Sequence, residues 1–241
     1  MALAQVVRAH AAAADPRLIV ALDLPTRAEA EDMVERLDDA VSFYKIGLQL
    51  LAVGGMETAR ALKRAGRNVF LDWQLHDIGA TVEKATAAIA AAEAGDFITV
   101  HGEPQVLAAA VRGKAGAPLK ILGVTVLTSL DDKDLAEIGY ERTVEALVER
   151  RVRQVLDAGA DGVIVSPREA ALARRIGGPD LLVVTPGVRP AGASLDDQAR
   201  ASTPAHTLKE GASHVVCGRP VTAAADPRAA ALAIAEEMAG V

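Results

Sequence analysis

The chain has 241 residues, 51% of them hydrophobic, and a formal net charge of −6. This length allows one large domain with a substantial core, and we expect a single domain spanning residues 1–241. The acidic balance argues against nucleic acid or an anionic membrane as the main partner. The single cysteine, Cys217, excludes an internal disulfide and fits a reducing compartment. Residues 1–14 lack the features of a secretion signal, so we expect a cytoplasmic protein.

Apolar, strand-like runs alternate with helical segments from residue 18 to residue 238. In the first unit, a strand at 18–24 precedes a helix at 27–37, for which Thr26 is a suitable N-cap. The later strands are predicted at 43–50, 68–75, 97–101, 121–128, 162–166, 181–185 and 214–218. The helices that follow them are predicted at 55–65, 80–94, 104–112, 143–158, 168–176, 204–210 and 227–238.

The chain thus contains eight strand-then-helix units, whose strands are apolar nearly throughout. Continuous apolarity is typical of parallel strands that are covered on both faces. Eight such units in a chain of this length predict the α/β class and a (β/α)₈, or TIM, barrel. An open doubly wound sheet is the alternative architecture that the pattern allows.

Polar residues gather at the predicted carboxyl ends of the strands, where the active sites of such barrels lie. In the segment 69–81 an apolar strand ends in Asp72 and Gln74, with Asp77 just beyond. Because side chains at i and i+2 point the same way in a strand, Asp72 and Gln74 are expected to share one face, with Trp73 on the other. The other polar residues at strand ends are Asp23, Lys45, His101, Ser129, Ser166, Arg189 and Arg219. Together they predict one pocket.

Two loops with glycine and arginine follow the last two predicted strands, at 185–190 and 216–220. Barrels bind phosphate at this position, where glycines let backbone N–H groups approach the anion and arginine binds it through paired hydrogen bonds. The residues suited to this are Gly187, Arg189, Gly218 and Arg219. The segment 191–201 could close over a ligand, with Gln198 as a further donor. Ordinary turns with solvated arginines are the alternative interpretation.

The charged residues Asp23, Lys45, Asp72 and Asp77 form a second group at the strand ends. An alternating chain of carboxylates and an ammonium is sensible there because unpaired buried charges are costly, and structural salt bridges are the alternative. The histidines show no metal-ligand spacing, so we expect no metal, although the three carboxylates could hold Mg²⁺. No Walker or dinucleotide-binding motif is present, so ATP and NAD are not implied.

Short motifs at the predicted strand ends follow one another almost from end to end of the chain. They are Leu22-Asp23-Leu24, Tyr44-Lys45-Ile46-Gly47, Leu75-His76-Asp77-Ile78, Val100-His101-Gly102, Val126-Leu127-Thr128-Ser129, Thr185-Pro186-Gly187-Val188-Arg189-Pro190, Asp197-Gln198 and Cys217-Gly218-Arg219-Pro220-Val221. In this order they resemble the motifs of the orotidine 5′-phosphate decarboxylase family. The resemblance implies loss of CO₂ from C6 of orotidine 5′-monophosphate, without metal or organic cofactor. The product would be uridine 5′-monophosphate, in the last step of de novo pyrimidine nucleotide synthesis.

The resemblance also implies which residues bind the small-molecule substrate. Arg219 and Gln198, together with the loops that carry Arg189 and Gly218, would hold its phosphate. Ser129 would read the pyrimidine edge.

Charged residues would serve the ribose and the reacting carbon. The resemblance assigns Asp23 and Lys45 to the ribose and places Asp72 against the leaving carboxylate, with Lys45, Asp72 and Asp77 in the catalytic group. Asp77 and Thr81 would reach into the neighbouring subunit's site of a homodimer.

The chain departs from the family pattern at one position. The family's third-strand motif is Asp-x-Lys-x-x-Asp, and here it reads Asp72-Trp73-Gln74-Leu75-His76-Asp77. That lysine is expected to stabilise and protonate the C6 carbanion, and an amide has neither the charge nor an acidic proton. We therefore expect strongly impaired decarboxylation.

Several interpretations of Gln74 stand side by side. It could be an active-site replacement that traps a ligand, a feature of an impaired natural relative, or the mark of a changed chemistry. The first is favoured because the surrounding residues remain suited to the original reaction. Two other functions stay open, namely a non-catalytic protein that binds pyrimidine nucleotides and a Mg²⁺-dependent sugar-phosphate lyase using Asp72 and Asp77.

Overall fold

Eight parallel strands close into a barrel, in chain order, in the computed structural model, which describes residues 14–190 and 202–241. The strands are β1 (Leu18–Ala21), β2 (Phe43–Ile46), β3 (Asn68–Leu75), β4 (Phe97–His101), β5 (Lys120–Val124), β6 (Gly162–Ile164), β7 (Leu182–Pro186) and β8 (His214–Cys217). Because β1 pairs in parallel with both β2 and β8, the sheet has no free edge. The predicted (β/α)₈ barrel is confirmed, and the open doubly wound sheet is excluded.

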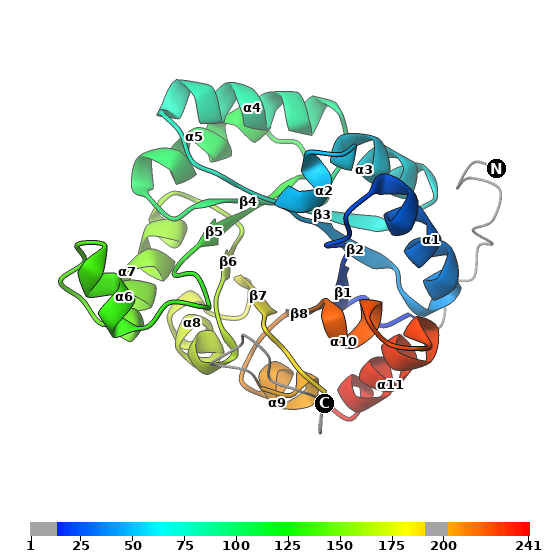
Figure 1. Ribbon diagram of the computed structural model, residues 1–241. Helices are drawn as coiled ribbons and strands as arrows, with labels where there is room; N and C mark the ends of the chain where they lie inside the picture. Colours follow the sequence, from blue (N-terminus) through cyan, green and yellow to red (C-terminus); the bar gives the residue numbers. More distant parts are fainter. Residues whose placement is uncertain (1–13, 191–201) are drawn as a thin grey trace.

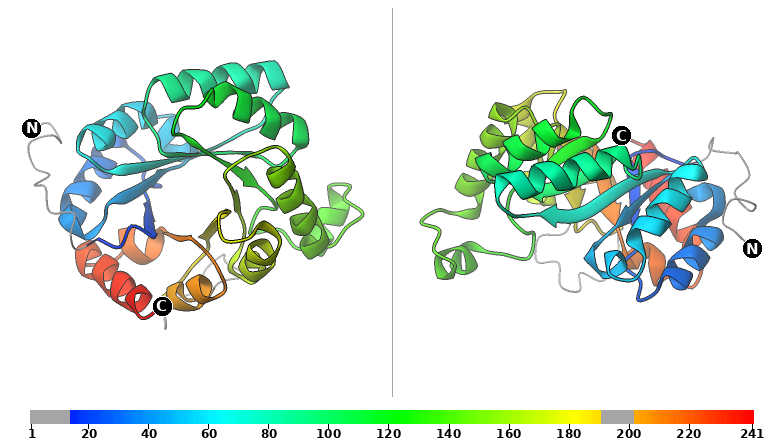
Figure 2. Two further views of the ribbon diagram at one scale, coloured as in Figure 1. Left: turned by 180° about the vertical axis from the view of Figure 1, so that it is seen from behind. Right: turned by 90° about the horizontal axis from the view of Figure 1, so that it is seen from above.

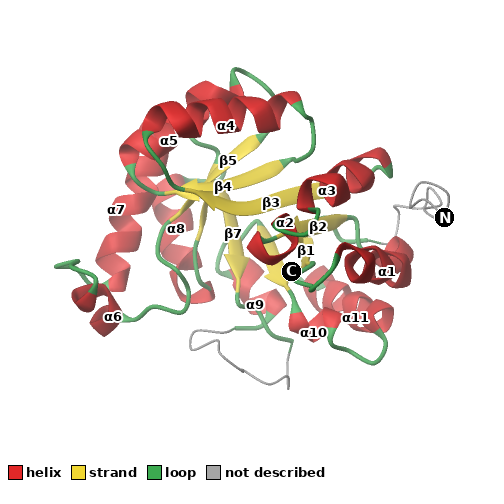
Figure 3. Cartoon of the chain, turned by 45° about the horizontal axis from the view of Figure 1, so that its top comes forward, coloured by secondary structure: helices red, strands yellow, loops and turns green. Residues whose placement is uncertain are grey.

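Helices surround the strands on the outside of the barrel (Figures 1 and 3). They are α1 (Arg27–Leu37), α2 (Leu48–Leu51), α3 (Gly55–Arg64), α4 (Gly79–Ala91), α5 (Pro104–Lys114), α6 (Asp132–Glu137), α7 (Val144–Asp157), α8 (Ala170–Gly177), α9 (Pro204–Lys209), α10 (Arg219–Thr222) and α11 (Pro227–Ala239). Of these, α6 stands away from the barrel beyond α7 (Figure 2). Within the described ranges, no helix has both the length and the apolarity that a membrane crossing requires.

The predicted N-cap of the first helix shows how local sequence sets a boundary. Thr26 accepts a hydrogen bond from the backbone N–H of Glu29, whose carboxylate in turn accepts from the backbone N–H of Thr26. This reciprocal pair satisfies donors that would otherwise have no partner at the start of α1.

Alternate strand residues form two apolar layers. On β1, Ile19 belongs to the cluster inside the barrel, whereas Leu18 and Val20 belong to the layer between strands and helices. The interior cluster contains the three phenylalanines Phe43, Phe70 and Phe97, the last of which packs edge-on against both of the others. These large rings fill the barrel, so it is a packed core and ligands are confined to its ends.

Several strand predictions were too long. The strand expected at 18–24 ends at Ala21, and the strand expected at 162–166 ends at Ile164. The strand expected at 43–50 ends at Ile46, and Leu48–Leu51 is helix α2. The strand expected at 121–128 ends at Val124, although Val126 is still buried. In each of these places the apolar run continues past the last residue with a paired neighbour, and apolarity alone cannot separate a strand from a buried loop or a short helix. The short helices α2, α6 and α10 were not predicted.

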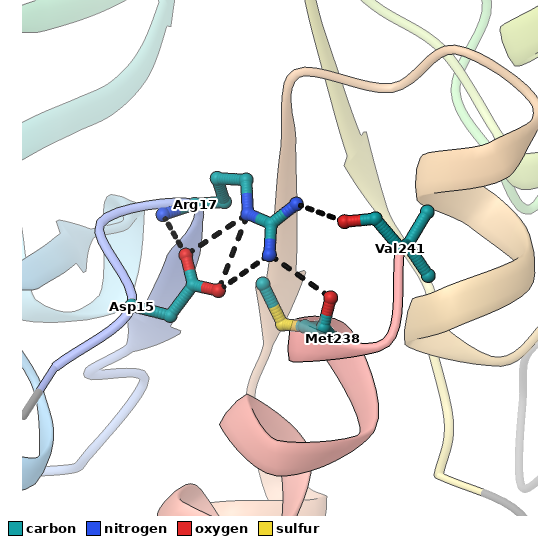
Figure 4. A network of polar contacts seen from close by, with 4 residues as sticks. All are labelled: Asp15, Arg17, Met238 and Val241. Carbon is teal, nitrogen blue, oxygen red and sulfur yellow. Dashed lines mark hydrogen bonds and ion pairs between the residues drawn. The ribbon is translucent and has the colours of Figure 1, made fainter.

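The two ends of the described chain meet at the end of the barrel where the strands begin. Arg17 pairs with Asp15 at 2.7 Å, and the same guanidinium donates to the carbonyls of Met238 at 2.9 Å and Val241 at 3.4 Å (Figure 4). This network ties the segment leading into β1 to the end of α11. It therefore links the first and last elements of the barrel wall.

His214, the first residue of β8, is packed among the aromatic rings at the opposite end of the barrel from the strand carboxyl ends. Its ring lies edge-on to Phe97 at 5.2 Å and to Phe43 at 5.8 Å. Burial lowers the pKa of His214 to about 4, against a smaller opposing effect of Asp15. The imidazole is therefore neutral in the folded protein at neutral pH.

We expect His214 to make the folded state acid-sensitive. Between about pH 6.5 and pH 4 the imidazole is protonated in the unfolded chain but neutral in the folded protein. The stability that is present above about pH 6.5 is therefore lost as the pH falls toward about 4. The loss should be on the order of 2–3 kcal/mol. His214→Phe keeps an aromatic ring without a titratable group, and urea unfolding between pH 7 and pH 4 should show a flatter dependence. Equal pH dependence in the two proteins would contradict this account, and the exposed His206→Ala serves as the control.

Candidate active site

A cavity of about 460 Å³ lies at the carboxyl ends of the strands, within the size range of small-molecule sites. Residues from β1, β2, β3, β7 and β8 and from the loops after them bring polar groups to its wall, while Val124, Ile164 and Val216 form an apolar floor. The predicted site residues on its lining are Asp23, Lys45, Asp72, Gln74, Gly187, Arg189, Gly218 and Arg219. The fold brings these residues together, whereas His101, which was predicted for the same pocket, does not line it.

Lys45 lies between two carboxylates. Its Nζ is 3.0 Å from Asp23 Oδ1 and 3.4 Å from Asp72 Oδ2, and the residue is only 8% exposed. Burying an ammonium is costly unless it is paired, and here carboxylates of the two neighbouring strand ends pair it. Gly47 leaves room for this arrangement, since a Cβ there would lie 2.5 Å from Asp23 Oδ1 and 2.9 Å from Lys45 Nζ.

Strand β3, which carries Asp72 and Gln74, has a bulge in its pairing with β4. The four residue steps from Leu71 to Leu75 on β3 span only two on β4, from Ile98 to Val100. Within this bulge Gln74 has φ 48°, in the left-handed region that costs a residue with a side chain on the order of 1–2 kcal/mol. Asp72 and Gln74 both reach the cavity, whereas Trp73 packs in the outer layer, so they share a face through an irregular strand.

Thr99 holds the bulge in place. Its hydroxyl accepts the backbone N–H of Gln74 at 2.9 Å and donates to Asp72 Oδ1 at 2.9 Å, and the residue is fully buried. The Nε2 of Gln74 lies 3.5 Å from the same Asp72 oxygen. One hydroxyl therefore orients both the backbone at position 74 and the neighbouring carboxylate. Thr99 was not among the predicted site residues, although its place two positions after the inward-facing Phe97 on the same strand was a usable signal.

The loops after β7 and β8 form the cationic side of the cavity. Gly187 has φ 78°, a conformation that favours glycine, and it leads to Arg189. Arg189 is 7% exposed; its Nη1 donates to the Val188 carbonyl at 3.0 Å, while its Nε has no hydrogen-bond partner among the described residues. Arg219 lines the same cavity from the start of α10, with Thr222 one turn further on. A buried guanidinium with an unused donor is suited to receiving an anion.

The remaining predicted binding residues lie elsewhere. Asp77 and Thr81 are exposed and do not line the cavity, and Asp77 Oδ1 accepts the backbone N–H of Ile78. Ser129 is exposed in the turn after β5, and the cavity wall there is made by Leu127 and Thr128.

Two further strand-end residues have other surroundings. Ser166 is buried and donates to the carboxylate of Glu169, which ties down the short turn before α8. Gln198 falls outside the described residues, so its expected contact with a phosphate stays a prediction.

Beyond the cavity, the fold assembles a group that residue spacing did not reveal. His76 and His101 stack at 4.4 Å, and Glu103 Oε2 lies 3.7 Å from His76 Nε2 and 3.9 Å from His101 Nδ1. Arg151 pairs with the other oxygen of Glu103 at 2.7 Å. Burial lowers the pKa of His101, with smaller effects in the same direction from His76 and Arg151 and an opposing one from Glu103.

Comparison with known proteins assigns the chain to a family. Residues 16–234 match the model of the orotidine 5′-phosphate decarboxylase / HUMPS family. The chain belongs to this family. An orotidine 5′-phosphate decarboxylase of Caulobacter sp. (strain K31) is 64% identical over 228 residues, covering 95% of this chain and 99% of the relative. One of Methylobacterium radiotolerans is 53% identical over 228 residues, covering 94% and 98%.

A solved member of the family has the same fold. The crystal structure of orotidine 5′-phosphate decarboxylase from Lactobacillus acidophilus superposes with a TM-score of 0.82 at 35% identity, covering 93% of this chain and 99% of that one. The chain therefore shares its barrel fold with a solved orotidine 5′-phosphate decarboxylase.

We expect the Thr99 hydroxyl to stabilise the fold through the bulge. Thr99→Val keeps the side-chain volume but leaves the half-buried backbone N–H of Gln74 without its acceptor and Asp72 without one of its donors, which should cost about 1–3 kcal/mol in the free energy of unfolding. Urea denaturation measures this cost. Thr86→Val is a matched control, because Thr86 is equally buried and its hydroxyl has no partner within the described chain, so that change should cost little. Equal effects at the two positions would contradict the assigned role of Thr99.

Proposed function

We propose that this chain is an orotidine 5′-monophosphate decarboxylase scaffold that binds pyrimidine nucleoside monophosphates and turns over slowly because Gln74 occupies the position of the family's lysine. The proposal rests on family membership and on one observation about the cavity. Its wall combines the cationic loops after β7 and β8 with the Asp23–Lys45–Asp72 chain, over an apolar floor. A ligand with an anionic group at one end and hydroxyls at the other fits such a cavity.

The phosphate would lie against the loops. Arg189 and Arg219 supply positive charge, and Gly187 and Gly218 let backbone groups approach an anion closely. Gln198 would add a donor once the ligand is bound. Binding energy gained here, far from the reacting carbon, can be used to position the ring at the other end of the cavity.

The ribose and the reacting carbon would lie near Lys45. Asp23, half exposed at the cavity wall, can accept a ribose hydroxyl while it pairs with the ammonium. Asp72 would lie next to the substrate carboxylate, where two like charges disfavour the bound substrate relative to a state that has lost CO₂. Thr99 keeps Asp72 in that orientation. Ser129 would approach the pyrimidine edge from the turn after β5.

Gln74 would limit the chemistry. Its amide lies beside Asp72, at the place where the resemblance puts the family's lysine, but it carries no charge and no transferable proton. The carbanion left after loss of CO₂ would have neither a cation to stabilise it nor an acid to protonate it. The Nε2 of Gln74 is directed at Asp72 Oδ1, so a lysine ammonium at this position would extend the alternating chain of carboxylates and ammonium groups.

Restoring the acid tests this part of the proposal. Gln74→Lys should raise the rate of loss of orotidine 5′-monophosphate absorbance by roughly 10²–10⁴, the usual worth of general acid catalysis, or more if electrostatic stabilisation is added. Gln74→Met has a similar length without a proton or charge and should give no gain. A Gln74→Lys protein that binds nucleotide but shows no gain in rate would leave the non-catalytic nucleotide-binding protein as the better reading.

We further propose a homodimer in which Asp77 and Thr81 complete the partner's site. Both are exposed beside Ile78, an apolar residue that is 69% exposed at the same barrel end. This proposal rests on the family resemblance, which assigns Asp77 and Thr81 to the neighbouring subunit's site.

Mixing two inactive variants tests the shared site. In the Gln74→Lys background, Asp72→Asn and Asp77→Asn should each be nearly inactive, because each site would lack one carboxylate. After subunit exchange, mixed dimers should hold one intact site, which restores on the order of a quarter of the parent activity. Activity that never exceeds the sum of the separate variants would show that Asp77 acts within its own subunit.

The Mg²⁺-dependent lyase has less support. Asp72 lines the cavity and is already bonded to Lys45 and Thr99, whereas Asp77 lies outside the cavity wall. The two carboxylates are therefore not presented to one ion within the described subunit. A decarboxylation rate of the Gln74→Lys protein that a chelator leaves unchanged would exclude this chemistry.

A further inference from the structure

We propose that His76, His101 and Glu103 form a binding site for a divalent transition-metal cation of the Zn²⁺ type, separate from the nucleotide cavity. These side chains each offer one ligand atom, and the three atoms lie within 4.8 Å of one another. Two imidazole nitrogens and one carboxylate oxygen form a ligand set that proteins use for zinc, with a fourth position left for water. None of the three residues lines the cavity that the proposed function uses.

The fold itself builds the group from two neighbouring strand ends. The paired register of Leu75 and Val100 brings the next residues, His76 and His101, side by side. Glu103 follows two residues after β4, immediately before α5. Because the two histidines come from the ends of two different strands, they form no local metal motif, which explains why the spacing of histidines in the sequence did not reveal the group.

Glu103 has an oxygen in need of a partner. Its Oε1 accepts from Arg151 Nη2 at 2.7 Å, but its Oε2 is buried and has no hydrogen bond to any described residue. Oε2 is the atom that points toward both imidazoles, at 3.7 and 3.9 Å. A buried carboxylate oxygen without a donor is costly, and a cation between it and the two nitrogens would satisfy it.

The surroundings hold the carboxylate ready. Arg151 is 8% exposed and is itself positioned by Gln154 Oε1 at 3.3 Å and the Tyr140 hydroxyl at 3.4 Å. Partners that orient a ligating group in this way commonly support metal sites. The guanidinium also neutralises one carboxylate charge, so it favours a site of moderate affinity over a very tight one.

Binding requires a small rearrangement. Ligand atoms around tetrahedral zinc lie about 3.3 Å apart, so the two distances from Glu103 to the imidazoles must shrink by on the order of half an ångström. The two imidazole nitrogens, which lie within 4.8 Å of each other, must also approach. The two rings are also nearly parallel, with 18° between their planes, and one must turn for both nitrogens to face the ion. The His76 side chain is 57% exposed and can make that turn, since the terminal torsion of histidine is soft.

Zinc titration of the full-length protein, freed of any histidine tag and of bound metal by a chelator, tests the proposal. Isothermal calorimetry should show saturable binding of about one Zn²⁺ per chain, and His76→Ala and Glu103→Gln should each weaken it at least tenfold. Glu103→Gln keeps the side-chain shape and an acceptor for Arg151, so it should fold. His206→Ala removes an exposed histidine elsewhere and should leave binding unchanged.

The supporting and the contradicting results of this titration differ in which variants lose zinc affinity. Loss of zinc affinity in the two site variants but not in His206→Ala would support the site, with a rise in the melting temperature on adding zinc only where binding persists. Absence of saturable binding to the unchanged protein, or equal affinity in all four proteins, would overturn the proposal. The melting temperatures of the metal-free variants show that any loss reflects ligands and not unfolding. Neither result depends on decarboxylation or on nucleotide binding.

Discussion

The buried ammonium of Lys45 is the constraint around which the strand ends are arranged. It lies between Asp23 of the loop after β1 and Asp72 of β3, so it requires three successive strands to end at matching heights. Because Lys45 is buried, a single carboxylate would offset only part of the free-energy cost of removing its ammonium from water. Gly47 provides the space beside the pair, because a side chain there would collide with both partners.

The bulge in β3 follows from the same requirement. A regular strand would continue its pairing with β4 past Leu71, but the register breaks there and resumes at Leu75. The break turns Asp72 toward Lys45 and puts Gln74 in a left-handed conformation that must be stabilised from outside. Thr99 does this with a single hydroxyl that serves the backbone of Gln74 and the carboxylate of Asp72. The strained residue is thus the one at which the proposed chemistry depends most on side-chain identity.

Much of this arrangement could be predicted from the sequence, for physical reasons. Apolar strands covered on both faces give a clear signal, so the eight units and the barrel could be predicted. Because the carboxyl ends of the strands converge in any such barrel, most of the pocket residues could be predicted as well. Strand lengths were less accessible, because the apolar runs past Ile46 and Val124 look the same whether or not a neighbour pairs with them. The bulge, Thr99 and the His76–His101–Glu103 group depend on register between β3 and β4, which a single sequence does not encode locally.

The central claim is that the cavity holds a nucleoside monophosphate by its phosphate and positions the rest against Lys45. Calorimetric titration of the unmodified chain with uridine 5′-monophosphate, and in parallel with uridine, tests it most directly because catalysis is not needed. The account predicts saturable binding of one nucleotide per chain, and affinity for the nucleoside weaker by roughly 10–100-fold or more, since charge-assisted contacts to phosphate are lost. Equal affinity for the two ligands, or no binding of the nucleotide, would contradict it.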